Sequence, residues 1–181
     1  HRQSSAASDV YKRQELSSKS YLENDAINDP HCNFEDLIDF RDGIIILSGS
    51  INSLSGNLFN KGLFDEVTSI YKTLSKNFSD NFFIEIQRHN DVNEKQFENY
   101  NLEQSKILNL PIIATNEVFY IDQSMHEAHD ALMCIGQKTY VNDGNRNRLS
   151  NNHYLKSSNE MIELFKDLPE ALDNNFNLPY R

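Results

Sequence analysis

The chain has 181 residues, 38% of them hydrophobic, with no tryptophan and a formal net charge of −10 at pH 7. This length suffices for one domain with its own core. The acidic excess argues against a nucleic-acid groove, because phosphate binding depends on Lys and Arg. Cys32 and Cys134 lie far apart, which is typical of a reducing compartment without disulfides. No apolar run approaches the ~20 residues that span a bilayer, so we expect a cytoplasmic protein without membrane contact.

The two ends of the sequence differ in character from the middle. Residues 1–14, HRQSSAASDVYKRQ, have no core pattern and resemble the adaptor-derived leaders of translated environmental sequences, so a non-native leader is predicted there. The domain is expected to occupy residues 15–176. Residues 177–181 are expected to begin a connection to a further part of a longer protein.

The first part of the domain is predicted to contain two helices and a strand. A short helix is expected over 17–28, where an Asp-Pro pair ends it. A second helix is expected at 34–38, where the apolar residues have helical spacing. Residues 44–47, IIIL, predict a strand covered on both faces by helices. Residues 48–57 predict a polar loop, and no G-K-[ST] follows to make it a phosphate loop.

The central part alternates between helix and strand. An amphipathic helix is predicted at 64–74, a strand at 82–86, then a further helix and a third strand from 110–111. The residues predicted to form the buried face of the further helix are Phe97, Tyr100, Gln104 and Ile107. This β-α-β-α-β order, with helices of crossover length, predicts parallel strands and right-handed connections.

The last part is predicted to be helical around a polar loop. Residues 123–135 predict one helix, and an Asn- and Arg-rich loop follows it. Ser157 and Glu160 have the spacing of a capping box, which predicts a helix from there through Phe165. Pro169 is expected to open the final helix.

Polar residues follow two of the predicted strands. His89 comes just after strand 82–86, and Glu117 follows the next strand. The carboxyl ends of parallel strands are where ligands gather in α/β folds, and both residues are candidate metal ligands. The competing interpretations are that His89 is an ordinary surface-loop residue and that Glu117 is a solvated carboxylate. For each residue considered alone, this competing interpretation is favoured. Glu117 has no second donor two residues on, where Phe119 stands.

A second pair of histidines is interpreted as structural. His126 and His129 share a helix face, but an H-E-x-x-H zinc site needs i, i+4 spacing. The favoured interpretation is a helix N-terminal turn with a histidine hydrogen-bonded into the packing. Neither cysteine has an activating neighbour in the sequence and no Ser-His-Asp set is evident, so no catalytic residue is predicted.

Five stretches carry a resemblance to a known family. They are GIIILSG (43–49), FFIEIQRHN (82–90), LNLPIIATNEVFY (108–120), HEAHDALMCIG (126–136) and NEMIELFKDLPEALDN (159–174). In this order and spacing, from about residue 16 to 180, the chain resembles the PHP (polymerase and histidinol phosphatase) domain of the bacterial DNA polymerase III alpha subunit, a C-family replicative polymerase, in its α-proteobacterial form. The resemblance implies an α/β fold: the C-terminal part of a distorted (β/α)7 PHP barrel with parallel strands and outer helices.

The resemblance also implies what the strand-end residues once did. Active PHP relatives bind metal ions at the carboxyl ends of the strands, and His89 stands at a metal-binding histidine of the third motif. The fourth motif, Asp-x-His, reads Glu117-Val118-Phe119 here, so one ligand is lost. The first motif, His-x-His, lies outside the chain. His89 and Glu117 are therefore expected to be vestigial metal ligands in a degenerate, non-catalytic domain.

The family further implies partners and cofactors. Structural support of the polymerase and docking of a proofreading exonuclease subunit are expected, beside other holoenzyme subunits, with little direct DNA contact. No cofactor is expected in this segment: Mg²⁺ belongs to the polymerase core beyond 177–181, and Zn²⁺ or Mn²⁺ only to an active PHP site. The alternatives are an active metal-dependent PHP phosphoesterase or 3′–5′ exonuclease, with His89 and Glu117 as ligands, and a free-standing enzyme similar to histidinol phosphatase.

Overall fold

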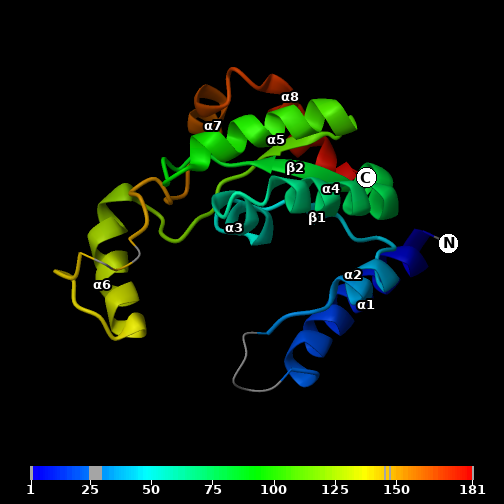
Figure 1. Ribbon diagram of the computed structural model, residues 1–181, viewed down its shortest axis with the longest axis horizontal. Coiled ribbons are helices and arrows are strands. Elements are labelled where there is room, and N and C mark those ends of the chain that lie inside the picture. Colours follow the sequence, from blue (N-terminus) through cyan, green and yellow to red (C-terminus); the bar gives the residue numbers. More distant parts are fainter. Residues whose placement is uncertain (1, 25–29, 145, 147, 181) are drawn as a thin grey trace.

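A parallel three-stranded sheet lies at the centre of the computed structural model, with helices around it (Figure 1). The structure describes residues 2–24, 30–144, 146 and 148–180, and within them the side chains from residue 11 onward. The helices and strands are α1 (Arg2–Leu22), α2 (Phe34–Asp39), β1 (Ile46–Leu47), α3 (Leu54–Asn60), α4 (Phe64–Phe78), η1 (Ser79–Asn81), β2 (Phe82–Ile86), α5 (Glu94–Leu108), β3 (Ile112–Ala114), η2 (Gln123–Met125), α6 (His126–Gln137), α7 (Ser158–Leu164), α8 (Pro169–Asn177) and η3 (Leu178–Tyr180).

The strands follow one another in space as they do along the chain. The order is β1-β2-β3, and both pairs are parallel, with Ile46 opposite Phe82 and Ile84 opposite Ile112. This confirms the predicted β-α-β-α-β arrangement and the α/β class. The described residues form three strands, and closure into a (β/α)7 barrel stays a prediction.

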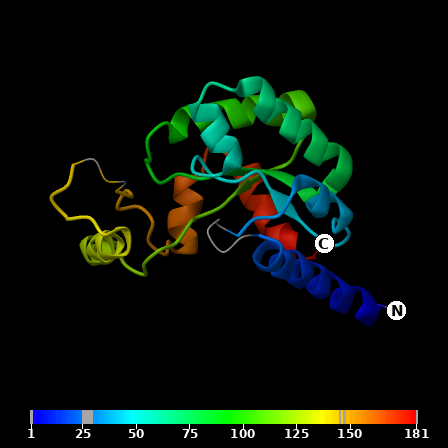
Figure 2. The same cartoon turned by 60° about the horizontal axis from the view of Figure 1, so that its bottom comes forward.

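The core is formed by β2 and the helices that pack on it. Phe82, Phe83 and Ile84 are fully buried, as are Val67 and Tyr71 of α4. Helices α3, α4 and α5 lie on one side of the strands, and α7 and α8 lie on the other (Figure 2). The Tyr71 hydroxyl donates a hydrogen bond to Asn101 Oδ1 (2.9 Å) on α5, and burial raises the pKa of Tyr71 to about 12. The apolar runs read from the sequence thus fill a core shared by α4, α5 and the sheet.

The two edges of the sheet differ in whether their backbone groups have hydrogen-bond partners. On the β3 side, Asn174 and Asn175 of α8 donate side-chain hydrogen bonds to the carbonyl oxygens of Ile112 (2.7 Å) and Ala114 (2.5 Å). These amides take the place of a neighbouring strand and cover the edge. On the other side, β1 pairs with no further strand among the residues described.

Three local predictions are wrong. The strand predicted at 44–47 is only Ile46–Leu47, and it is not covered on both faces, because Ile45 and Leu47 are 37% and 36% exposed. Residues 48–57 are not all loop, because α3 begins at Leu54: the Ser53 hydroxyl caps it by accepting from the Gly56 N–H (3.3 Å). Ile107 does not belong to the buried face of α5, since its side chain is 64% exposed. Glu98 and Asn101 are buried on that helix instead, because both have polar partners in the interior.

The N-terminal helix differs from its predicted limits. Helix α1 begins at Arg2, inside the predicted leader 1–14, and ends at Leu22 before the predicted end at 28; residues 25–29 lie outside the described part. Leu16 is buried whereas Leu22 is 83% exposed, so the helix contacts the body through its middle. The leader boundary at 14 stays a prediction. None of the described helices is both long and apolar enough to cross a membrane.

Candidate functional site

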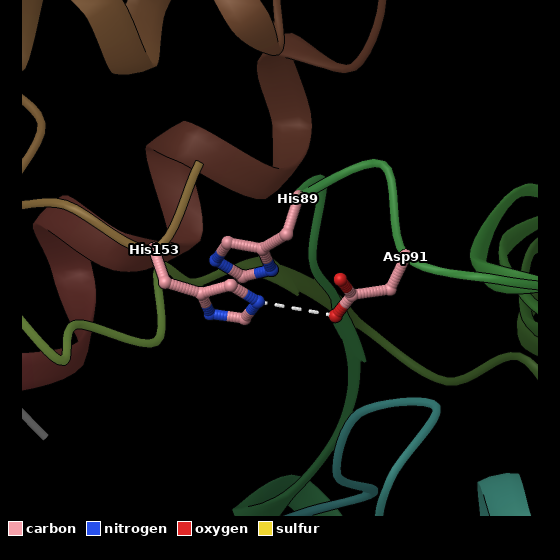
Figure 3. A group of neighbouring side chains, drawn as sticks. All are labelled: His89, Asp91 and His153. Atoms are coloured by element: carbon pink, nitrogen blue, oxygen red, sulfur yellow. Dashed lines mark hydrogen bonds and ion pairs between the residues drawn. The ribbon is translucent and has the colours of Figure 1, made fainter. Parts of the chain in front are cut away.

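A stacked pair of histidines lies at the carboxyl end of β2. His89 follows β2 and His153 lies in the segment before α7; their side chains are 1% and 0% exposed. The ring centroids are 4.0 Å apart and the planes differ by 3°. Asp91 Oδ2 is 3.1 Å from His153 Nε2 (Figure 3). The candidate ligand atoms of these three residues lie within 4.8 Å of one another, so the cluster is the first place to test for a metal.

His153 reaches this place through a short strand-like contact beyond β3. Tyr120 and Tyr154 form an isolated parallel bridge. The Phe119 N–H donates to the His153 carbonyl (2.9 Å), and the Leu155 N–H donates to that of Tyr120 (3.0 Å). The segment that carries His153 therefore continues the sheet order past β3 and brings a distant part of the chain onto the β2 exit.

Both ring nitrogens of His89 face oxygen atoms of the protein. Nδ1 lies 3.3 Å from Glu94 Oε1, and Nε2 lies 3.1 Å from Asn116 Oδ1. The Glu94 carboxylate also accepts from the backbone N–H groups of His89 and Asn90, each at 2.7 Å. Asn90 has a left-handed backbone (φ 62°), which Asn tolerates better than most residues. The β2 exit is thus a tight turn closed by the first residue of α5.

His153 is held in the same way. Its Nδ1 lies 3.3 Å from the backbone oxygen of Glu117 and 3.9 Å from the Glu117 carboxylate. The hydrogen bond to His153 lowers the pKa of Asp91 below its usual value. The Phe119 ring packs against the imidazole at 5.3 Å.

A lysine ammonium group lies next to the histidine pair. Lys156 Nζ donates to Asn116 Oδ1 (2.8 Å), the same atom that faces His89, and to the Asn152 carbonyl. It also sits 4.7 Å from the centroid of the Tyr154 ring. Burial lowers the pKa of Lys156. The Lys156 ammonium group therefore lies beside the histidine cluster and is linked to His89 through Asn116.

The arrangement of the rings does not fit a metal ion. A ring nitrogen binds a metal through a lone pair in the plane of its ring, at about 2.0–2.1 Å for zinc. Stacked parallel rings direct these lone pairs side by side, so no single point lies on both. Each nitrogen of His89 and His153 also has a protein oxygen within 3.3 Å. A neutral imidazole carries one N–H, so each ring donates a hydrogen bond to one of its two facing oxygens, and these bonds join two segments of chain.

The predicted site residues meet in this cluster, with two corrections. His89 is buried rather than a surface-loop residue, because the 150–154 segment covers it. Glu117 is 39% exposed but contacts His153, so it is not simply a solvated carboxylate. Asp91 and His153 were missed. No periodicity or motif marks His153, and its place depends on the contact past β3, which a single sequence does not reveal.

A cavity of about 230 Å³ lies beside the cluster. Its lining residues are Asn52, Glu117, Phe119, His126, His129, Asp130, Met133, Gln137 and Leu149. His126 Nε2 lies 3.0 Å from the Leu149 carbonyl, and the His129 ring stacks on Phe119 at 5.5 Å. The hydrogen bond predicted for a histidine of this pair is present at His126, and its structural role stays a prediction.

The fold and the cluster define a parallel α/β segment with polar residues gathered at the carboxyl ends of its strands. No protein-family model matches the chain. The chain is similar to DNA polymerase III subunit alpha of Rickettsia bellii (36% identity over 92% of this chain), of Caulobacter vibrioides (32% over 92%) and of Pseudomonas aeruginosa (34% over 77%). It spans 14%, 15% and 12% of the length of these relatives. The chain thus matches a segment of this subunit.

Proposed function

We propose that the chain is a segment of the alpha subunit of a replicative DNA polymerase III, which as a whole carries out DNA-directed DNA synthesis in the cytoplasm. The similarity to that subunit over 92% of the chain is the observation that carries this proposal. The two-metal polymerase chemistry would belong to a region outside these residues. The net charge of −10 supports a position away from the DNA groove.

The segment itself acts as a structural, non-catalytic PHP domain. The histidine stack supports this, because the two rings are parallel and each ring nitrogen lies within 3.3 Å of a protein oxygen, on Glu94, Asn116, Asp91 or the Glu117 backbone. Its parallel strands and helical layers are compatible with part of a PHP barrel. The domain supports the polymerase and offers a docking surface to a proofreading exonuclease subunit of the holoenzyme.

The place of the segment in a longer protein is tested on the gene. Sequencing past codon 181 should show an open reading frame that continues for many hundreds of residues and contains the carboxylates of a polymerase site. A stop codon shortly after Arg181 would contradict the polymerase proposal and favour a free-standing enzyme similar to histidinol phosphatase.

The alternative is an active metal-dependent phosphoesterase or 3′–5′ exonuclease. It is favoured by one observation, the convergence of His89, Asp91 and His153 within 4.8 Å. Metal binding would require at least one ring to turn out of the stack and exchange its protein acceptor for the ion.

Metal titration separates the two functions. The purified full-length protein, titrated with Zn²⁺ and Mn²⁺ by calorimetry and analysed for metal by mass spectrometry, should bind no ion stoichiometrically at the cluster and should not excise a 3′-mismatched primer end. Stoichiometric binding and excision that His89→Ala abolishes, while His126→Ala on α6 retains both, would establish the active alternative.

Docking of the exonuclease subunit is tested separately. Immobilised chain should bind the purified proofreading exonuclease subunit from the same genome in a concentration-dependent, saturable manner. An Ile84→Asp variant, which disrupts the core, serves as the unfolded control. Equal binding by both forms would mean that capture is non-specific and would remove this role.

A further inference from the structure

A buried amide on α5 has a hydrogen-bond partner for only one of its two polar atoms. Asn101 is 1% exposed, and its Oδ1 accepts a hydrogen bond from the Tyr71 hydroxyl (2.9 Å). Its Nδ2 carries two N–H groups and has no partner among the residues that the structure describes. A buried donor in this position costs more free energy than a typical hydrogen bond contributes. Folded proteins supply such a group with another polar atom or with an ordered water.

A backbone acceptor at the end of β2 is also left open. In the ladder with β1, the Ser48 N–H donates to the Phe83 carbonyl (3.0 Å), and the Glu85 N–H donates to the Ser48 hydroxyl (2.9 Å). The N–H and C=O groups of one strand residue point to the same side, so the Glu85 carbonyl also faces the β1 side. The next ladder donor would be the Ser50 N–H, but this bond is not formed among the residues described, because the chain leaves the sheet after Ser48.

A small cavity has both of these residues in its walls. Asn101, Glu85 and Ser50 line it, and so does Glu98, whose side chain is 3% exposed. It lies where α5 runs alongside β2 (Figure 1). The cavity volume is about 10 Å³, which is close to the smallest space that holds one water, about 10–15 Å³. The cavity therefore matches a single water molecule and is too small for an organic ligand.

The two open groups determine what this cavity can hold. Asn101 Nδ2 is a donor and requires an acceptor, whereas the Glu85 carbonyl is an acceptor and requires a donor. An anion would face that carbonyl and the Glu98 carboxylate, and a metal cation would face the N–H groups of Asn101. A water molecule satisfies both groups, because its oxygen accepts from Nδ2 and one of its hydrogens is donated to the carbonyl. Its second hydrogen is available to the Glu98 carboxylate, which would complete the three hydrogen bonds that a buried water typically makes.

We propose that this cavity is a binding site for one ordered water, which bridges Asn101 Nδ2 and the Glu85 carbonyl. The water takes the place of the Ser50 N–H and continues the ladder of β2 past the end of β1. The chain can then turn away from the sheet after Ser48 without leaving a buried carbonyl unpaired. The same water ties α5 to the end of β2, just before the turn that carries His89. The proposal concerns the core of this chain and does not rest on the proposed function.

A crystal structure of the full-length protein tests the site, at a resolution that shows ordered waters elsewhere in the core. It should show density for one water at hydrogen-bond distance, about 2.7–3.2 Å, from both Asn101 Nδ2 and the Glu85 carbonyl oxygen. No density there in the wild type would overturn the proposal. Density with contacts of about 2.0–2.6 Å to the surrounding oxygens would also overturn it, because such distances belong to a metal ion.

Two variants test whether Asn101 holds the water. Asn101→Leu is similar in size and removes the Nδ2 donor, so the density for the water should be lost. Tyr71→Phe is the matched control: it removes the same Tyr71–Asn101 hydrogen bond but keeps the donor, and the water should remain. Density that persists in Asn101→Leu, or that disappears equally in both variants, would contradict the assignment. If Asn101→Leu does not fold, the wild-type density and the Tyr71→Phe variant still decide the proposal.

Discussion

The sheet body and the α6 region are stabilised in different ways. The body, formed by β1–β3 with α3–α5, α7 and α8, buries large apolar side chains such as Phe82, Phe83 and Phe165 completely. The α6 region, residues 120–144, 146 and 148–150, leaves Leu132 and Ile135 largely exposed. It contains instead a buried ion pair, in which Arg146 binds Asp130 through two nitrogens. One region is held by apolar burial and the other by local polar contacts.

This difference predicts a difference in cooperativity. Elements that share a buried core unfold together, whereas a region with few buried apolar contacts can open by itself at a lower free energy. The histidine stack lies between the two, because the segment that carries His153 leaves the α6 region and enters the body. The α6 region should therefore open locally while the stack and the sheet stay closed.

The same substitution in both regions is the strongest test. Ile84→Ala in β2 removes a fully buried side chain and should lower the free energy of unfolding by about 2–5 kcal/mol. Ile135→Ala on α6 removes a side chain that is 75% exposed, and its effect should stay within about 0.5 kcal/mol. Urea denaturation measures both losses. Similar losses would show that the two regions form one cooperative unit.

The next largest effect is expected at Arg88. Its guanidinium donates two hydrogen bonds to Glu98 (2.7 and 3.1 Å), two to Asp167, and one to the Leu164 carbonyl (2.6 Å). The Glu98 side chain is 3% exposed, so Arg88→Met would leave a buried carboxylate without its main partner. The free energy of unfolding should fall by about 3 kcal/mol, as measured by urea denaturation.

The matched substitution in the α6 region is Arg146→Met. It breaks a comparable pair with Asp130, and it should leave the urea midpoint of the sheet body unchanged while amide exchange of α6 becomes at least ~tenfold faster. An equal shift of the global midpoint in both variants would mean that the α6 region is not an independent unit.

The sheet body could largely be predicted from the sequence because its order is local. Continuous β-branched and aromatic runs fix the strands, and periodic apolar residues fix α4. The errors arise where polar groups, and not apolar periodicity, determine whether a segment is helical or a residue is buried. Ser53 caps a helix inside a segment read as a loop, and Asn101 of α5 is buried with its Oδ1 accepting a hydrogen bond from Tyr71 although its Nδ2 has no partner among the described residues. Apolar periodicity cannot detect a buried amide whose oxygen accepts a hydrogen bond from the core.

Only part of the candidate site could be predicted from the sequence. His89 and Glu117 follow predicted strands, so the rule for strand ends places them at one edge. His153 is different, because it reaches the site through the bridge at Tyr120 and Tyr154, a long-range contact without a local pattern. The same holds for Lys156, whose ammonium group shares Asn116 with His89.

A smaller effect is expected from acid. The hydrogen bonds from Arg88 lower the pKa of Asp167 from 3.8 to about 2. A carboxyl group with a lowered pKa in the folded state adds stability that is complete above its unfolded value and is lost as the pH falls through its folded value. The wild type should therefore lose stability between about pH 4 and pH 2, in excess of an Asp167→Asn variant. The effect should be modest, because the Asp167 side chain is 56% exposed. If the free energies of unfolding of the two proteins fell in parallel over this pH range, the Arg88–Asp167 interaction would not be the cause of the acid loss.

The smallest effect is expected at the N-terminus of α7, which has the cap that α6 lacks. The Ser157 hydroxyl accepts from the Glu160 N–H (3.3 Å), and the Glu160 carboxylate accepts from the Ser157 N–H (2.8 Å). Ser157→Ala should cost about 1 kcal/mol in urea denaturation, and Ser158→Ala, one residue into the helix, should cost little. Because α7 packs on the sheet, the loss at Ser157 should appear in the global midpoint. If it appeared only as faster amide exchange within α7, this helix would belong with α6 among the locally unfolding elements, and the boundary of the body would have to be drawn before residue 157.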